Sequence, residues 1–452
     1  MQDHETTSDV RAVLQIAAHF VSLKERATQF LCEFSANQRG HFTPTEDDQV
    51  RQLLVSYWHS RNALLELVTN RKKARLDVET RPMRFLAAFS GALVLIDAAR
   101  FIRDEMHDRP VVRRKLNEPE PHFEIPAGCY DQIQKSLTRP AHAWHLYHAN
   151  HHFEANAESL EQIASADSET QQLFDLVQGL RLRLDVSAKR FATARVRVRA
   201  RALRTRVEGV VVGRAMYGLQ KAVSQLVSDK YVKLNHSPQL PTAIVEEIET
   251  LLEPGDILVT RKAHAVTNYF LPGYWPHAAL FVGDSARLCE RQLDQHANLI
   301  QHWDELLSID ELQPRRVVES MKDGVRLRSL ATPLKCDAIT ILRPTLSSES
   351  LTEVIARAFF HVGKPYDFDF DFSRSDRLVC SEVVYRAFDG LDGTAFQLQK
   401  RAGRLTLAPE DLIRMALRSE FFNVVASYIS TAADTLQTGE AAVASVKATL
   451  RD

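Results

Sequence analysis

A single cysteine, Cys380, stands where a charged, irregular stretch gives way to a helical pattern that runs to Phe388. A thiol at the start of a helix faces the positive end of the backbone dipole and several N–H groups that have no partner within the helix. Both effects favour the thiolate, which is the nucleophilic form of cysteine. A nucleophilic thiol also requires an imidazole to take its proton and a polar group to orient that imidazole. His277 opens a strand-like run and Glu319 closes another, so residues of the required types are present.

Each of these residues also has a purely structural interpretation. A lone histidine on an apolar strand is more often a core residue than a catalytic one, and a carboxylate at a strand end can be half of a surface ion pair. Because side chains alternate along a strand, His277 can face one side of a sheet while Ala278 faces the other. Glu319 follows two valines and can point along the same face as His277. The residue types therefore permit a Cys–His–Glu site without requiring one.

The C-terminal half supplies the elements that would position these residues. After a linker-like stretch, residues 236–241, short β-type runs alternate with turns. Strands are expected at residues 256–260, 277–283, 316–320, 324–328, 338–342 and 422–429. Helices are expected at residues 351–362, 380–388 and 409–417, with another around 300–307. The pattern predicts an α+β domain over residues 236–429 with an antiparallel sheet and the Cys380 helix packed on one side.

The N-terminal half has a different pattern. From Asp9 to about Lys233, apolar residues recur at helical spacing, interrupted by prolines such as Pro44 and Pro82. An all-α domain of unassigned role is therefore expected over residues 1–235. Its most apolar run, residues 85–96, is shorter than the roughly 20 residues that span a bilayer, and it indicates a buried helix. Residues 430–452 are expected to form a separate tail that is either helical or frayed.

Composition narrows the class of protein. The 452-residue chain has a net charge of −1 and 45% hydrophobic residues, so a substantial core is expected and no global field favours nucleic acid. The N-terminus lacks the apolar core of an export signal, and five scattered cysteines fit a reducing compartment better than a disulfide framework. A cytoplasmic location is therefore expected. No cysteine spacing suits a metal, and nothing in the sequence calls for a cofactor.

Two clusters could hold a metal but have simpler interpretations. His148 and His152 share a helix face, which suits either a metal or, more simply, solvent. Asp367, Asp369 and Asp371 alternate with phenylalanines. That pattern suits either a cation or, more simply, a turn or edge strand with one acidic face.

A basic run from Lys189 to Arg206 falls within one long helix, or two consecutive helices, expected between Ser168 and Lys233. A basic helix can bind an anionic membrane surface or an acidic partner. The simpler interpretation is a solvated helix whose arginines lie against acidic neighbours. Peripheral membrane contact therefore stays open as an alternative.

Five short motifs follow one another between residues 253 and 388. They are Pro254-Gly255-Asp256-Ile257-Leu258, the stretch from Asn268 to Gly283 that contains His277, Val317-Val318-Glu319-Ser320, Gly363-Lys364-Pro365-Tyr366-Asp367, and Cys380-Ser381-Glu382-Val383-Val384-Tyr385. In this order they resemble the permuted papain-like amidases of the YaeF/YiiX type, which belong with the NlpC-type cysteine hydrolases and are related to the lecithin:retinol acyltransferase group. The resemblance implies a circularly permuted papain-like fold, in which the histidine and the polar residue precede the cysteine. It does not extend to residues 1 to about 240.

The resemblance also implies a role for each residue. Cys380 would attack a carbonyl carbon, His277 would take the thiol proton and later protonate the leaving group, and Glu319 would hold the imidazole tautomer. The backbone N–H of Cys380 would donate to the oxyanion, and the candidates for a second donor are Tyr269, Tyr274 and Tyr366. Glu382 is expected to cap its helix or to pair with an arginine.

These roles lead to one hypothesis and two alternatives. The hypothesis is a cysteine hydrolase (an amidase, peptidase or esterase) that cleaves an amide or ester bond through a thioester intermediate. Apolar residues before His277, such as Phe270 and Trp275, suit either a lipid-like acyl chain or the core. One alternative is a lipid acyltransferase, which passes the acyl group to an acceptor other than water. The other is a catalytically idle domain carried by a helical module that binds a membrane or a partner.

Overall fold

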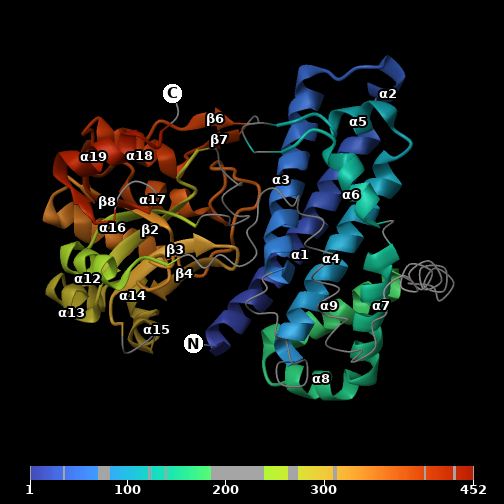
Figure 1. The fold of residues 1–452 in the computed structure, drawn as a ribbon, viewed down its shortest axis with the longest axis horizontal. Coiled ribbons are helices and arrows are strands. Elements are labelled where there is room, and N and C mark those ends of the chain that lie inside the picture. Colours follow the sequence, from blue (N-terminus) through green and yellow to red (C-terminus); the bar gives the residue numbers. More distant parts are fainter. Residues whose placement is uncertain are drawn as a thin grey trace. The chain divides into compact units, whose positions relative to one another are not determined.

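The structure is a computed structural model, and it divides into two compact units, Met1–Asn235 and His236–Asp452 (Figure 1). The residues that it describes are 2–33, 36–69, 82–120, 123, 125–137, 140–184, 239–262, 273–308, 313–401, 404–430 and 434–450. The basic run from Lys189 to Arg206 and the candidate oxyanion donor Tyr269 lie outside these ranges, so the expectations placed on them stay predictions.

The N-terminal unit is built from helices. Its long helices pack against one another: α1 (Gln2–Glu33), α3 (Pro44–Thr69), α4 (Pro82–Met106) and α9 (Ser168–Leu184) (Figure 1). Its shorter helices are α2 (Ala36–Arg39), α5 (Pro110–Lys115), α6 (Cys129–Leu137), α7 (Pro140–Ala155) and α8 (Ala157–Ala164). Val13, Ile16 and Phe20 recur at helical spacing in α1 and are all buried. The all-α prediction for this unit is therefore confirmed.

Helix α4 forms the core of this unit. Among the described residues it is the one helix long and apolar enough to cross a membrane, and 72% of its most apolar stretch is buried. Phe85 and Phe89 are fully buried, and their stacked ring centroids lie 5.6 Å apart. The helix contacts α1, α3 and α9. The buried helix expected over residues 85–96 is therefore confirmed.

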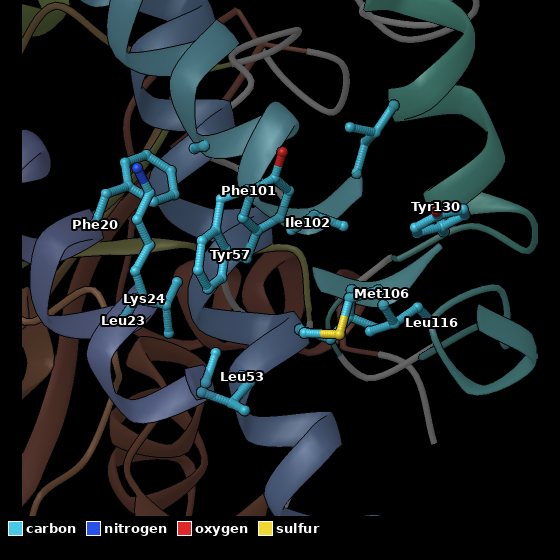
Figure 2. A pocket seen from close by; sticks show the side chains of 14 residues that line it. Phe20, Leu23, Lys24, Leu53, Tyr57, Phe101, Ile102, Met106, Leu116 and Tyr130 are labelled. Carbon is cyan, nitrogen blue, oxygen red and sulfur yellow. The ribbon is translucent and has the colours of Figure 1, made fainter. Parts of the chain in front are cut away.

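An apolar cavity of about 50 Å³ lies between α1, α3, α4 and α6 (Figure 2). Leu54, Ala98 and Ile133 contribute to its almost wholly apolar wall. Lys24 also lines it and forms an ion pair with Asp97. Because truncating a buried side chain here would remove apolar contacts and enlarge the cavity, stability should respond sharply to truncation.

The described part of the C-terminal unit contains a seven-stranded antiparallel sheet in the order β4-β3-β2-β1-β5-β8-β9. The strands are β1 (Ile257–Arg261), β2 (His277–Gly283), β3 (Arg316–Met321), β4 (Gly324–Ser329), β5 (Ala338–Pro344), β8 (Phe422–Ile429) and β9 (Gln437–Thr438). A two-stranded sheet pairs β6 (Gln399–Arg401) with β7 (Arg404–Thr406). Ile244 and Ile248 of α12 (Thr242–Leu251) pack against sheet residues that include Phe281. The α+β prediction with an antiparallel sheet is confirmed.

Several helices of this unit match their predicted bounds. Helices α17 (Cys380–Phe388) and α18 (Pro409–Leu417) begin and end as expected. Helix α16 (Ser348–Phe360) begins earlier than predicted, because the Ser347 hydroxyl accepts the N–H of Ser350 at 3.2 Å and caps the helix. The helix expected around residues 300–307 is instead two short helices, α14 (Ala297–Ile300) and α15 (Trp303–Ser308). A further short helix, α13 (Ser285–Glu290), precedes them.

Residues 430–452, which the sequence sets apart as a tail, contain β9 and α19 (Gly439–Lys447). Strand β9 pairs with β8, and α19 also contacts β8. Ala442 and Val446, four residues apart on α19, are fully buried. This apolar stripe packs the segment into the C-terminal unit.

Residues 367–371, which contain the alternating aspartates, form a turn, which is one of the two structures expected for them. The carboxylate of Asp367 accepts the N–H groups of Asp369 at 3.0 Å and Asp371 at 2.6 Å. Asp367 and Asp369 are 0% and 2% exposed, so these two carboxylates are buried within the turn. The physical reason is that the Asp367 oxygens satisfy backbone donors within the turn.

Candidate active site

The three residues named from the sequence come from adjacent elements. His277 begins β2, Glu319 lies within β3, and Cys380 is the first residue of α17. Strands β2 and β3 are paired neighbours in the sheet, and α17 contacts both. Segments separated by about a hundred residues in the chain, such as residues 276 and 380, therefore meet here.

The imidazole of His277 lies against the carboxylate of Glu319. Its Nε2 is 2.6 Å from Glu319 Oε2, which is a short hydrogen bond. With Nε2 engaged, Nδ1 is the ring nitrogen left for the thiol of Cys380. This arrangement fixes both the tautomer and the orientation of the ring.

Cys380 occupies the position at which a helix favours an anion. Its helix begins after Val379, which has an extended backbone and no side-chain cap. The thiol is 3% exposed, and Sγ lies 4.0 Å from the carbonyl oxygen of Pro276, the residue before His277. Two hydroxyl groups anchor the backbone on either side: Ser320 donates to the Leu378 carbonyl and Ser381 to the Leu407 carbonyl, each at 2.6 Å.

The electrostatics of the pair favour a protonated imidazole. Burial alone lowers the pKa of His277, but the hydrogen bond and charge of Cys380, followed by those of Glu319, outweigh burial and raise this pKa to about 9. An imidazole that keeps its proton through neutral pH is the partner that a thiolate requires. Burial raises the pKa of the Cys129 and Cys336 thiols to about 12, so these two cysteines stay protonated at neutral pH.

Glu319 is held as a carboxylate although it is only 1% exposed. Burial raises its pKa, but the hydrogen bond and charge of His277, followed by the charges of Arg328 and Lys262, outweigh burial and hold the pKa below its usual value. Arg328 Nε lies 3.3 Å from Glu319 Oε1. Arg328 was not among the residues named from the sequence, although its place in the alternating β4 pattern puts it on the strand next to β3.

The structure distinguishes two of the three tyrosines considered as oxyanion donors. Burial raises the pKa of Tyr366, and the charge of Cys380 raises it further, so this phenol lies within the electrostatic reach of the sulfur. The Tyr274 ring instead lies against Arg261, whose guanidinium carbon is 4.4 Å from the ring centroid. Of the two described candidates, Tyr366 is the one for which an electrostatic interaction with Cys380 is found.

Glu382 supports the cysteine helix from within. It is 0% exposed and pairs with Arg386, one turn later, at 2.6 Å. Burial raises its pKa to about 8 despite the opposing charge and hydrogen bond of Arg386. The expected pairing with an arginine is therefore found.

No metal site is evident in the parts of the chain that the structure describes. No group of three or more histidine, cysteine, aspartate or glutamate side chains in these ranges has the arrangement of a metal site. Of the two histidines considered, His152 packs edge-on against Phe85, with ring centroids 4.8 Å apart.

Comparison with known proteins gives one match. Residues 251–438 match the family model described as permuted papain-like amidase enzyme, YaeF/YiiX, C92 family. No curated protein and no solved structure matched the chain. The matched segment contains β1 to β8, α17 and the residues His277, Glu319 and Cys380. The resemblance of this segment to the permuted papain-like amidases of the YaeF/YiiX type is therefore confirmed over residues 251–438.

Proposed function

We propose that the C-terminal unit is a cysteine hydrolase that cleaves an amide or ester bond through a thioester intermediate. The observation that carries this proposal is the position of His277, whose Nε2 is held by Glu319 at 2.6 Å and whose neighbour Pro276 has its carbonyl oxygen 4.0 Å from Cys380 Sγ at the start of a helix. The family match supports the reaction class, and the geometry supports the assignment of roles.

The first half of the reaction forms a bond to sulfur. The Cys380 thiolate attacks the carbonyl carbon, and the carbonyl π electrons move to oxygen to give a tetrahedral oxyanion. The Cys380 N–H and the Tyr366 hydroxyl are the proposed donors to this oxygen. As the oxyanion collapses, the bond from carbon to the leaving nitrogen or oxygen breaks, and imidazolium His277 gives its proton to that atom. The products are a thioester on Cys380 and a free amine or alcohol.

The second half regenerates the enzyme. Neutral His277 takes a proton from water, and the resulting hydroxide attacks the thioester carbon. When the carbon–sulfur bond breaks, the carboxylic acid leaves and the thiolate–imidazolium pair is restored. Glu319 stays ionised throughout and stabilises the charged imidazole. An acceptor other than water at this step would give acyl transfer from the same intermediate.

The experiment is a screen of amide and ester probes on wild type and on Cys380→Ala, read by intact-protein mass spectrometry. The proposal predicts a covalent acyl adduct on Cys380 with at least one probe class, and no adduct in Cys380→Ala. Product analysis with added amines or alcohols distinguishes hydrolysis from transfer. Absence of any adduct on Cys380, with probes that label other cysteine hydrolases, would favour the idle-domain alternative.

We further propose that the protein works in the cytoplasm and that the run from Lys189 to Arg206 can contact an anionic membrane surface. The support is compositional, since clustered basic residues bind acidic lipids in a salt-dependent manner. Co-sedimentation with vesicles, with and without anionic lipid, tests this proposal. Binding that requires anionic lipid and weakens with salt is expected, and equal recovery with neutral vesicles would contradict it.

A further inference from the structure

The four residues that lead into β2, residues 273–276, are held at three points. Tyr274 donates its N–H to Glu410 Oε2 at 2.8 Å, and its carbonyl accepts from Arg261 at 2.7 Å. The indole N–H of Trp275 donates to the Thr449 hydroxyl at 2.8 Å, and Trp275 itself is fully buried. The segment is therefore fixed through both its backbone and its largest side chain.

This segment touches both reacting groups of the proposed site. It runs directly into His277, and the Pro276 carbonyl oxygen lies 4.0 Å from Cys380 Sγ. A displacement of residues 273–276 would therefore change the distance between the imidazole and the sulfur. Displacements of about 1 Å at a reacting centre can lower a rate by about 10²-fold.

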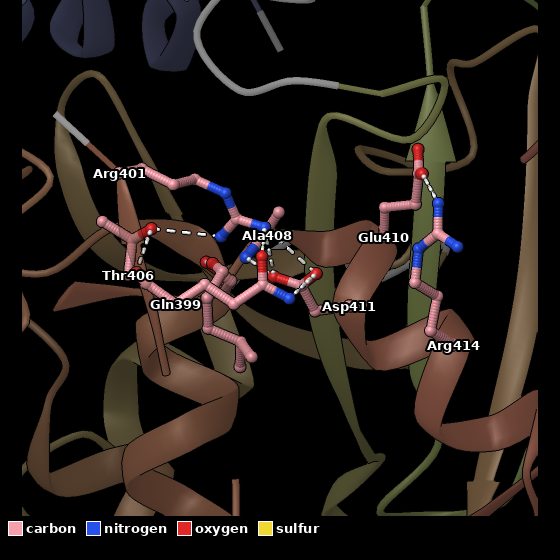
Figure 3. Close-up of polar contacts among 9 residues, drawn as sticks. Gln399, Arg401, Thr406, Ala408, Glu410, Asp411 and Arg414 are labelled. Atoms are coloured by element: carbon pink, nitrogen blue, oxygen red, sulfur yellow. Dashed lines mark hydrogen bonds and ion pairs between the residues drawn. The ribbon is translucent and has the colours of Figure 1, made fainter. Parts of the chain in front are cut away.

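Glu410 reaches this segment from α18, across 136 positions of the sequence. Its side chain uses both oxygens: Oε2 accepts from Tyr274, and Oε1 accepts from Arg414 at 3.0 Å (Figure 3). Glu410 is 8% exposed, so the carboxylate is held in place by packing as well as by its partners.

Gly273 lies against Glu410 and leaves room for its carboxylate. A Cβ at Gly273 would lie 1.9 Å from Glu410 Oε2, and the Gly273 φ of +111° is strained for any other residue. A glycine here thus admits the carboxylate to the backbone of the segment.

Asp411, the residue after Glu410, is the acid that caps α18. Asp411 accepts the Ala408 N–H at 2.7 Å and pairs with Arg401 at 2.9 Å (Figure 3). Glu410 and Asp411 are equally buried, each 8% exposed, and both lie in the first turn of α18. What sets Glu410 apart is its bond to Tyr274.

We propose that Glu410 is a positioning residue, which holds residues 273–276 so that His277 and Cys380 stay in reacting geometry. The proposal rests on the proposed hydrolase function and adds to it a residue outside the Cys–His–Glu set. Glu410 acts as a hydrogen-bond acceptor for one backbone N–H and does not touch the reacting atoms.

The test compares Glu410→Ala, Glu410→Gln and Asp411→Ala with wild type. The rate of Cys380 alkylation by iodoacetamide at pH 7 is measured by site-resolved mass spectrometry, and Tm is measured for each protein. Glu410→Ala is expected to slow alkylation about tenfold or more. Glu410→Gln keeps an acceptor oxygen and is expected to restore the rate to within about twofold of wild type. Asp411→Ala removes a helix cap of equal burial, and is expected to lower Tm while the alkylation rate stays unchanged.

Three results would overturn the proposal. One is an unchanged rate in Glu410→Ala. Another is a rate in Glu410→Gln as low as that in Glu410→Ala. The third is an equal loss of rate in Asp411→Ala, which would assign the effect to the stability of α18. A wild-type Cys380 that reacts no faster than free cysteine is a distinct result, because it removes the hydrolase function itself and the positioning role with it.

Discussion

Replacing Glu319 by glutamine should lower the pKa of His277. Glutamine keeps a hydrogen-bonding oxygen near Nε2, which lies 2.6 Å from the present carboxylate, but it removes the negative charge. The rise of the His277 pKa from 6.5 to about 9 corresponds to about 3 kcal/mol in favour of the imidazolium, at roughly 1.4 kcal/mol per pKa unit. Cys380 contributes more of this rise than Glu319 does. We therefore expect Glu319→Gln to lower the midpoint by about one pKa unit or more, and not to abolish the rise.

The assay is a histidine-selective NMR titration. The His277 ring signal is assigned by its loss in His277→Gln. Wild type should titrate near pH 9, as its raised pKa requires, and Glu319→Gln should titrate near pH 8 or below. At pH 8.5 the protonated fraction of His277 would then be about threefold lower in Glu319→Gln than in wild type.

A carboxylate in a different ion pair serves as the control. Glu253 pairs with Arg343 at 2.8 Å, away from the imidazole, so Glu253→Gln should leave the midpoint unchanged. A wild-type midpoint near 6.5, or a midpoint that is the same in Glu319→Gln, would refute the electrostatic reasoning.

Three further predictions concern stability. Leu54→Ala at the apolar cavity should lower the free energy of unfolding by about 2–5 kcal/mol, whereas Leu182→Ala, at a residue 82% exposed, should change it by less than about 0.5 kcal/mol. Chemical denaturation measures both values. Equal losses in the two variants would contradict the importance of packing at the cavity. Burial and nearby cations lower the pKa of His361 to about 3, so the stabilisation that depends on its neutral imidazole is fully present above pH 6.5 and is lost as pH falls toward 3. Denaturation at several pH values should therefore show that His361→Gln loses less stability than wild type as pH falls. An equal loss of stability in both proteins would contradict this assignment. Because the pKa of Glu382 is raised, the free energy of unfolding should decrease as pH rises from about 4.5 to 8. Glu382→Gln should remove this decrease in the same assay. A decrease that persists in Glu382→Gln would contradict the role given to Glu382.

Local sequence pattern was enough to predict the elements that carry the site. The helix Cys380–Phe388 follows from the spacing of its apolar residues, and the strand Phe422–Ile429 from its β-branched and aromatic content. The apolar pattern does not predict the start of α16, because Ser347, which caps the first turn, lies outside that pattern.

Contacts between distant segments could not be predicted from local sequence pattern. The placement of His277 beside Glu319 depends on the register of β2 against β3, in which Leu280 pairs with Val318. A shift of one residue reverses the face of every side chain that follows, and the sequence gives no direct signal for it. The bond from Glu410 to Tyr274 likewise joins residues 136 positions apart.

Burial of charged groups was the other property that the sequence did not reveal. The alternating aspartates suggested a turn or edge strand with one acidic face and gave no sign that Asp367 would be 0% exposed. Its carboxylate is tolerated there because it accepts two backbone N–H groups of its own turn. Alternation reports which residues share a face only where the backbone is extended, and this turn is not.

The most direct measurement is the alkylation rate of each cysteine in the native protein at pH 7, resolved by mass spectrometry. Cys32 and Cys289 are exposed and serve as internal controls for an ordinary thiol. We predict that Cys380 reacts faster than both although it is only 3% exposed, and that His277→Ala removes this advantage. Cys380 reacting more slowly than Cys32 and Cys289, or equally fast with and without His277, would contradict the assignment of a nucleophilic Cys380–His277 pair.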